Sequence, residues 1–211
     1  MATAIGHEIR NPLSSLKGFT QLQSEADQTN NGYYPIMIQE IDRINSIVDD
    51  LMYLGKPREI VFEKVKINEI IDYTLSITKQ QFKIQGINVD TIIDRQIPAI
   101  DCDQKQLKQV FINLIKNAIE AMPDGGTLKI RSEVLNVKNI CITVEDEGCG
   151  IMEEDFKNLG IPFYTTKTDG TGLGLMVTNQ IIKDHNGSLN FNSKYGKGTK
   201  VVVTLPISQR K

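Results

Sequence analysis

The sequence predicts an α+β chain: a two-helix hairpin, then an α/β sandwich in which helices cover one face of a mixed sheet. Three observations carry this prediction. Apolar residues recur in steps of three and four up to about residue 55, which is typical of amphipathic helices. Beyond residue 59, strand and helix patterns alternate, and the later strands follow one another as hairpins. The chain has 211 residues, of which 40% are hydrophobic and 24% charged, enough for two modest domains.

The first domain is expected over residues 1–55, as two helices joined by a turn at 25–32. The inward stripe of the first helix consists of Ile5, Ile9, Leu13, Leu16 and Thr20. The inward stripe of the second helix consists of Met37, Ile41, Ile44, Val48 and Leu51. Because one hairpin alone leaves these stripes in water, the pattern favours a homodimer whose two hairpins form a four-helix bundle. The alternative is a hairpin that folds back onto its own second domain.

The second domain is expected over residues 60–211, after a hinge at residues 56–59 that contains Pro57. The expected strands are residues 60–66, 87–93, 127–135, 139–145, 188–193 and 199–205. The expected helices are residues 68–82, 104–122 and 171–184. Strands and helices alternate in the first part of this domain, and the later strands follow one another directly. This order indicates one mixed sheet with helices on one face.

Composition narrows the classes of function. The formal net charge of −2 gives no electrostatic case for nucleic acid binding. No apolar run reaches the roughly 20 residues that cross a bilayer, so we expect a cytoplasmic chain without membrane contact. The three cysteines lack CxxC spacing and are expected to be reduced thiols. Met1 lies only six residues before His7, so we expect a truncated first helix and a longer parent protein, whose membrane anchoring stays open.

Two asparagines predict a metal and phosphate site. Asn113 and Asn117 lie four residues apart in an expected helix, so both amides share one face. An amide oxygen is a suitable ligand for Mg²⁺, which keeps several waters and bridges phosphates. Most neighbouring residues are apolar, and a polar side chain buried beside them requires a partner. The alternative is a pair of asparagines on a solvated helix face.

An aspartate at the end of a strand predicts an adenine site. Asp146 follows the expected strand and precedes Gly148 and Gly150. An ionised carboxylate only accepts hydrogen bonds, so it suits an exocyclic amine such as that of adenine. The glycines let the backbone approach the ring closely. The alternative is an ordinary β-turn with Asp at its first position.

A glycine-rich segment before a helix predicts a phosphate site. Gly170, Gly172 and Gly174 alternate with other residues, and backbone N–H groups at a helix N-terminus attract anions. Thr165, Thr166 and Lys167 precede them with two hydroxyls and a cation. The alternative is a flexible loop. The full set expected to bind nucleotide is Asn113, Asn117, Asp146, Gly148, Gly150, Thr165, Thr166, Lys167, Gly170, Thr171, Gly172, Leu173 and Gly174.

The chain has two histidines with different settings. His185 lies at an expected helix end, where a cation suits the helix dipole, so we expect a structural capping residue. His7 lies on the polar stripe of the first helix beside Glu8. A histidine next to a carboxylate fits a nucleophile with an orienting partner. The alternative is a solvated surface histidine.

Four segments, read in order, carry a family resemblance. They are His7–Leu13, Asn113–Ala118, Asp146–Ile151 and Gly170–Leu175. In order and spacing they closely resemble the H, N, G1 and G2 boxes of the sensor histidine kinases of bacterial two-component systems. The residues around the histidine are especially similar to sporulation kinases. The resemblance implies a HisKA dimerisation and phosphoacceptor domain followed by a Bergerat-type (GHKL) ATP-binding fold, with ATP and Mg²⁺ as cofactors.

The resemblance also implies roles for single residues. His7 would accept the phosphoryl group, and Glu8 would hold the ring nitrogen that does not attack. Asn11, one turn on, would orient water if the kinase dephosphorylates its partner. Asn117 would bind the metal and Asp146 would bind adenine. Residues 151 to about 175 would form a mobile lid over the nucleotide.

The implied function is that of a protein histidine kinase, a transferase. ATP-dependent autophosphorylation on His7 would be followed by phosphotransfer to an aspartate of a response regulator receiver domain, in two-component or phosphorelay signalling that controls sporulation. The regulator is expected on a polar helical stripe, and inhibitor proteins are expected on the same domain. The stripe consists of His7, Asn11, Ser14, Gly18 and Gln21. Hairpin handedness decides between autophosphorylation in cis and in trans, and both stay open.

Two other classes of function compete with the kinase. The first is an ATP-hydrolysing conformational machine such as gyrase. ATPase relatives carry a water-activating Glu four residues before the metal Asn, whereas this chain has Asn113, which is a poor base. The second is a dimeric scaffold with a dead nucleotide site, against which the intact Asn117, Asp146 and glycine-rich segment count.

Overall fold

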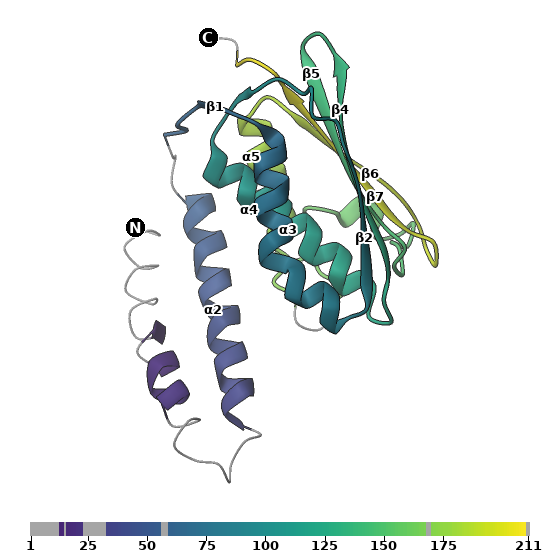
Figure 1. Cartoon of the computed structure of the whole chain (residues 1–211). Helices are drawn as coiled ribbons and strands as arrows, with labels where there is room; N and C mark the ends of the chain where they lie inside the picture. The colour runs from purple at the N-terminus through teal and green to yellow at the C-terminus, as the bar shows by residue number, and fades with distance from the viewer. Residues whose placement is uncertain (1–12, 15, 23–32, 56–58, 168–169, 210–211) are drawn as a thin grey trace. The chain divides into compact units, whose positions relative to one another are not determined.

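The computed structural model describes residues 13–14, 16–22, 33–55, 59–167 and 170–209 (Figure 1). The expected phosphoacceptor His7, with Glu8 and Asn11, lies outside these residues. The chain divides into two compact units: Met1–Glu59 with Ile161–Val177, and Ile60–Gly160 with Thr178–Lys211. The predicted domain limits and hinge stay predictions. Among the described residues, no helix combines the length and apolarity that crossing a membrane needs.

In the first unit, α2 (Tyr33–Gly55) pairs with helical residues 13–14 and 16–22. An ion pair between Lys17 and Asp42 joins the two helices. The hairpin buries only part of the expected apolar stripes. The stripe members that are buried are Leu13, Thr20, Ile41 and Val48. The stripe members that are exposed are Leu16, Met37 and Ile44. The hairpin therefore leaves an apolar surface uncovered within one chain.

The second unit is built on a five-stranded sheet of order β2-β4-β5-β7-β6. The strands among the described residues are β1 (Glu63–Val65), β2 (Ile87–Ile93), β3 (Ile100–Cys102), β4 (Gly126–Asn136), β5 (Asn139–Asp146), β6 (Ser188–Lys194) and β7 (Gly198–Pro206). β2 runs parallel to β4 and all other neighbours are antiparallel, so the predicted mixed sheet is confirmed. β1 and β3 form a separate two-stranded sheet.

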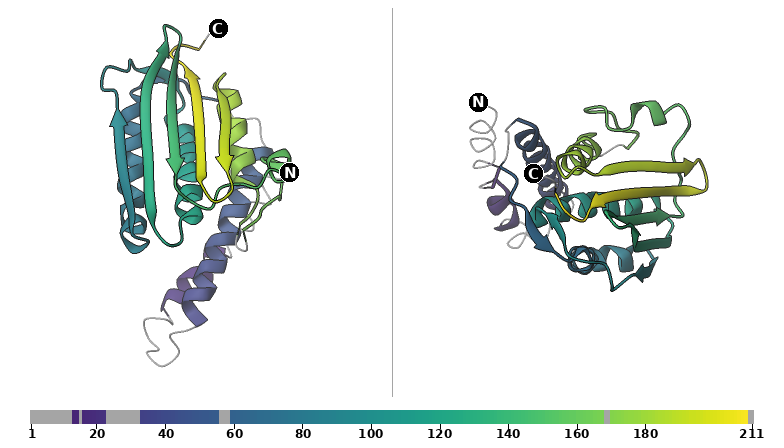
Figure 2. Two further views of the ribbon diagram at one scale, coloured as in Figure 1. Left: turned by 90° about the vertical axis from the view of Figure 1, so that its right-hand side faces the viewer. Right: turned by 90° about the horizontal axis from the view of Figure 1, so that it is seen from above.

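Helices cover one face of this sheet, and Figure 2 shows the opposite face bare. The helices described on that face are α3 (Ile67–Ile84), α4 (Gln104–Ala121) and α5 (Gly174–Asp184), and the short η1 (Phe156–Asn158) lies in the segment between β5 and α5. Of these, α3, α4 and the second part of α5, from Thr178, belong to the second unit, whereas α5 begins in the first. α5 starts three residues later than expected, because Gly172 has φ +69°, outside the right-handed helical region.

The core of the second unit lies between the sheet and the amphipathic helices. Alternate residues of β4 and β5, such as Ile130 and Ile142, face the helices and are fully buried. The bare face carries charges of opposite sign on neighbouring strands, since Lys129 pairs with Glu145 and Glu145 with Lys200. This alternation explains how one sheet packs a core on one side and meets water on the other.

Candidate functional site

α4 brings the two predicted asparagines to one edge of its buried stripe. The side chain of Asp103 caps the helix by accepting hydrogen bonds from the backbone N–H groups of Lys105 and Gln106. Asn113 and Asn117 follow on one face, both half-buried. The amide Nδ2 of Asn113 donates to the Thr178 hydroxyl of α5 over 2.7 Å.

Asp146 ends β5 as a buried carboxylate, with only 6% of its surface exposed. Its Oδ1 accepts two backbone hydrogen bonds, from Gly148 N at 2.9 Å and from Thr199 N at 3.2 Å. Two donors from different segments fix the direction of the carboxylate. This is the arrangement that a directional acceptor for a base edge requires.

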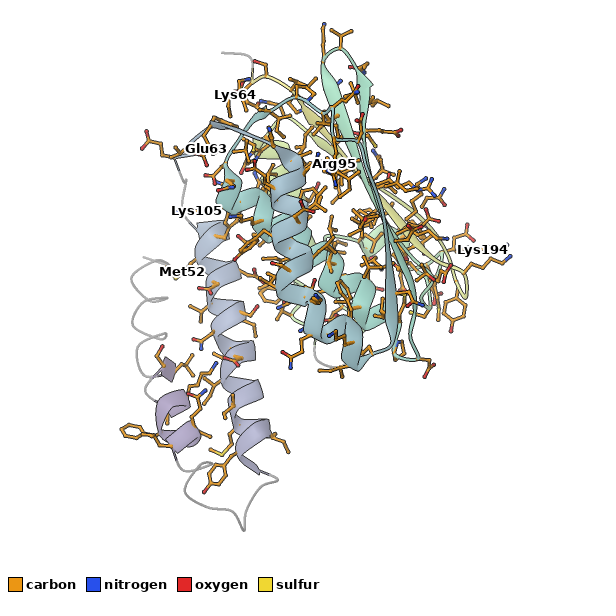
Figure 3. The ribbon with its side chains drawn as sticks, viewed as in Figure 1. Met52, Glu63, Lys64, Arg95, Lys105 and Lys194 are labelled. Carbon is orange, nitrogen blue, oxygen red and sulfur yellow. The ribbon has the colours of Figure 1, made fainter. Side chains whose placement is uncertain are left out.

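The glycines after Asp146 are required by contacts within the protein. A Cβ on Gly148 would lie 2.5 Å from the carbonyl oxygen of Ala121, the last residue of α4. Gly150 has φ +69°, and its Cβ would lie 2.2 Å from the carbonyl oxygen of Lys194, labelled in Figure 3 at the end of β6. Cys149 N donates to Ala121 O over 3.0 Å. The loop after Asp146 therefore packs against the end of α4 that carries Asn117, one turn away.

The glycine-rich segment and the residues before it from 161 onward belong to the first compact unit, whereas Asp146 and the two asparagines belong to the second. Thr165 Oγ1 accepts from Lys167 N at 3.1 Å, and Thr171 Oγ1 accepts from Leu173 N at 3.3 Å. Gly172 has φ +69°, and a Cβ there would lie 2.4 Å from the Phe163 carbonyl carbon. The segment therefore has its own local hydrogen bonds and close backbone packing. Thr166, Gly170 and Gly174 also lie here.

Three residues that the sequence did not indicate support the site. Thr199 donates its backbone N–H to Asp146, Thr178 partners Asn113, and Ser193 Oγ accepts from Ile151 N at 2.9 Å. Thr199 stands opposite Asp146 because β7 pairs with β5 in that register. Strand register and helix packing between distant segments leave no local sequence signal, so these roles could not be found from the sequence.

His185 has the structural role predicted for it at the end of α5, but its imidazole is not the expected cation. The side chain is fully buried, and its Nε2 accepts a hydrogen bond from Asp103 N over 3.0 Å. Nδ1 lies 2.8 Å from the carbonyl oxygen of Ile181 and donates to it, because the other ring nitrogen is the acceptor. Burial lowers the pKa of His185 below its usual value. The imidazole is therefore neutral, and it ties the end of α5 to the start of α4.

Comparison with known proteins identifies the family. Residues 102–209 match the family of histidine kinase-, DNA gyrase B-, and HSP90-like ATPases, and residues 1–60 match the His Kinase A (phospho-acceptor) domain. The chain belongs to the sensor histidine kinases, with a HisKA and a GHKL ATP-binding domain. Within this family it is similar to sporulation kinases: it is 41% identical to sporulation kinase E of Bacillus subtilis over 99% of this chain and 28% of that protein.

Solved structures agree with this placement. Full-length ShkA in complex with AMPPNP has a TM-score of 0.83 at 21% identity, over 99% of this chain and 46% of that chain, which supports the fold. Histidine kinase ThkA in complex with the response regulator TrrA has a TM-score of 0.73 at 28% identity, over 98% and 61% of the two chains. The chain spans less than half the length of the curated relatives it matches first.

Proposed function

We propose that this chain is an ATP-dependent protein histidine kinase that phosphorylates itself on His7 and passes the phosphoryl group to a response regulator. Residues 1–55 act as the dimerisation and phosphotransfer domain, and residues 60–211 act as the ATP-binding domain, joined by the hinge at 56–59. The observation that carries the proposal is the Asp146 carboxylate, oriented by two backbone amides beside the end of α4 that bears Asn117.

The residues near this site fit a magnesium ion that arrives with the nucleotide. Among the described residues, no group of three or more His, Cys, Asp or Glu side chains could hold a metal. A single amide ligand suits Mg²⁺, which keeps several waters and binds the phosphates of its substrate. Asn117 would provide this ligand, and the ion would neutralise charge on the phosphates.

The remaining roles follow from the chemistry of each group. Asp146 accepts the adenine amine, whereas Lys167 and the backbone N–H groups of Gly170–Gly174 contact the phosphates when residues 151–175 close as a lid. A ring nitrogen of His7 forms a bond to the γ-phosphorus, the bond to the bridging oxygen breaks, and ADP leaves. Glu8 holds the ring and stabilises the positive charge that develops on it.

The chemistry and the hydrogen bonding of the Asn113 side chain disfavour the competing ATPase function. An amide cannot accept a proton from water in the way that a carboxylate does, and this amide donates a hydrogen bond to Thr178. The γ-phosphoryl group is therefore passed to a protein nucleophile instead.

Incubation with ATP labelled at the γ-phosphate tests the reaction. The wild-type chain should acquire a label that is lost in acid and stable in base, as expected for phosphohistidine. His7→Gln should bind ATP with unchanged affinity and acquire no label. Glu8→Ala should label about 10²-fold more slowly, the usual contribution of acid–base assistance. Acid-stable label, or label that persists in His7→Gln, would contradict the assignment.

The partner is the receiver domain of a response regulator, the class of protein that ThkA binds in its crystal structure. It docks on the stripe of His7, Asn11, Ser14, Gly18 and Gln21. Gly18 supports this choice because no atom lies within 4 Å of a Cβ built on it. Gly18→Arg should therefore block phosphotransfer and leave autophosphorylation intact. Inhibitor proteins would compete for the same helices, and the use of ATP places the reaction in the cytoplasm.

A further inference from the structure

We propose that Thr178 on α5 is a positioning residue for the nucleotide site. Its buried hydroxyl fixes the orientation of the Asn113 amide, so that the carbonyl oxygen of that amide faces the hydrated Mg²⁺ that Asn117 would bind. The inference rests on the proposed function, because it assumes that α4 faces a nucleotide with both asparagines. It assigns a role to a residue outside the four sequence motifs.

Thr178 is an unusual residue for its place. Only 1% of its surface is exposed, and its neighbours on the same buried side of α5 are the apolar Val177, Ile181 and Ile182. A hydroxyl buried among apolar groups is costly unless it has a hydrogen-bond partner. Its partner is Asn113 Nδ2 at 2.7 Å, a short and well-formed hydrogen bond.

The hydrogen bond selects one of two orientations of the amide. An asparagine side chain has a donor arm, NH₂, and an acceptor arm, the carbonyl oxygen, and a half-turn of the planar group exchanges them. Because Thr178 receives the donor arm of Asn113, the oxygen is turned to the other side. Only the oxygen can bind Mg²⁺ or accept a hydrogen bond from a metal-bound water. The opposite orientation would direct two N–H groups towards a cation.

A second polar contact keeps Thr178 opposite Asn113. At the far end of α5, His185 Nε2 accepts the backbone N–H of Asp103, the cap of α4. The T-shaped contact of the His185 ring with Phe62, at 5.4 Å between ring centroids, packs the imidazole in place. α5 is therefore attached to α4 at two separate positions. Sliding of one helix along the other would break both contacts, so the Thr178 hydroxyl is held in register.

The test compares Thr178→Val with Thr178→Ser in the whole chain. Valine keeps the shape and removes the hydroxyl, whereas serine keeps the hydroxyl. Calorimetric titration with AMPPNP, with Mg²⁺ and with EDTA, is the readout. With Mg²⁺, Thr178→Val should bind about fivefold to tenfold more weakly, the usual effect of losing one hydrogen bond. Thr178→Ser should stay within about twofold of wild type. In EDTA the affinities of the wild type and the two variants for AMPPNP should differ little.

A double variant separates positioning from a structural role. If Thr178 acts only through the amide, Thr178→Val should weaken binding no further in an Asn113→Ala background. If Thr178 had only a structural role, Thr178→Val would instead lower the midpoint of thermal unfolding and leave the dependence of AMPPNP binding on Mg²⁺ unchanged. If Thr178→Val does not fold, Thr178→Ala must show the same Mg²⁺-dependent loss, and wild-type affinity in it would overturn the inference.

The two proposals can fail separately. Absence of AMPPNP binding by the wild-type chain would overturn the proposed kinase function itself. Normal binding by the wild type together with equal binding by Thr178→Val would overturn only the positioning role. Weaker binding that is the same with Mg²⁺ and with EDTA would also overturn it, because the amide oxygen would then have no part in metal binding.

Discussion

At the scale of single residues, the site depends on the direction in which a few polar atoms point. Asp146 is the clearest case, because two backbone donors from different segments hold the same oxygen, Oδ1. An asparagine at this position could still accept both backbone hydrogen bonds through its carbonyl oxygen. Its NH₂ group, however, would replace a carboxylate oxygen with a donor. Charge and direction of the acceptor can therefore be changed without changing the backbone contacts.

Asp146→Asn should abolish useful ATP binding and leave the fold intact. We expect a loss of about tenfold to a hundredfold in affinity for AMPPNP, the range for a hydrogen bond to a charged group. The measurement is calorimetric titration, with thermal unfolding as the test of folding. Glu145→Gln is the matched control, since it removes a carboxylate from the same strand on the bare face of the sheet. Wild-type affinity in Asp146→Asn would contradict the adenine assignment.

His185 makes the stability of the second unit depend on pH. Its pKa is lowered by burial in the folded protein, whereas the unfolded chain keeps the ordinary value of 6.5. As pH falls through 6.5, the unfolded state takes up the proton first, so the free energy of unfolding should decrease; the contribution is complete above this pH. Urea unfolding at pH 7.5 and below 6.5 measures the effect.

His185→Leu should remove that pH dependence and should also destabilise the unit at pH 7.5. The variant leaves Asp103 N without its acceptor, which costs about 1–3 kcal/mol. An unfolding curve for His185→Leu with the same pH slope as wild type would show that another group titrates. Unchanged stability at pH 7.5 would show that the Asp103 contact contributes nothing.

At the scale of elements, the sequence predicts long amphipathic segments well and short or register-dependent features poorly. The strand expected at 87–93 is β2, and the helix expected at 104–122 is α4 with one residue fewer. β3 (Ile100–Cys102) was not predicted because three residues carry no alternation. Asp146 could be singled out by its local motif, but Thr199 could not, because it reaches Asp146 only through the pairing of β7 with β5.

Helix α2 contains a buried carboxylate whose ionisation destabilises the folded hairpin. Asp50 is only 8% exposed, and burial raises its pKa from 3.8 to about 6. Between these values the folded state binds the proton more strongly, so stability falls as pH rises through this range. The difference corresponds to roughly 3 kcal/mol at most above pH 6. Asp50→Asn should therefore stabilise the hairpin at pH 7 by about 1–3 kcal/mol.

Thermal unfolding followed by helical circular dichroism, at pH 4 and at pH 7, measures this effect. The gain from Asp50→Asn should be present at pH 7 and small at pH 4, where the wild-type carboxyl is already protonated. Asp72→Asn, which removes an exposed carboxylate from α3, is the control and should change neither value. An equal gain at both pH values would show that burial of charge is not the cause.

At the scale of the whole molecule, the apolar surface of the hairpin predicts a homodimer. Leu16, Met37 and Ile44 belong to the expected inward stripes, yet they are 54%, 50% and 39% exposed in one chain. Apolar side chains at regular helical spacing on an exposed surface indicate an interface. A second hairpin would cover them and complete a four-helix bundle. Two apolar stripes that one chain buries only partly are therefore best explained by a second copy.

Light scattering on the full chain should give twice the monomer mass of 23.7 kDa, and Leu16→Lys with Ile44→Lys should shift it to the monomer value. The reason is that two charges would be buried in the bundle without partners. Val137→Lys is the matched control, because this apolar residue of the second unit is 95% exposed and should not affect assembly. Residues 60–211 alone should be monomeric. A stable dimer of that piece, or an unchanged mass in the double variant, would place the interface elsewhere.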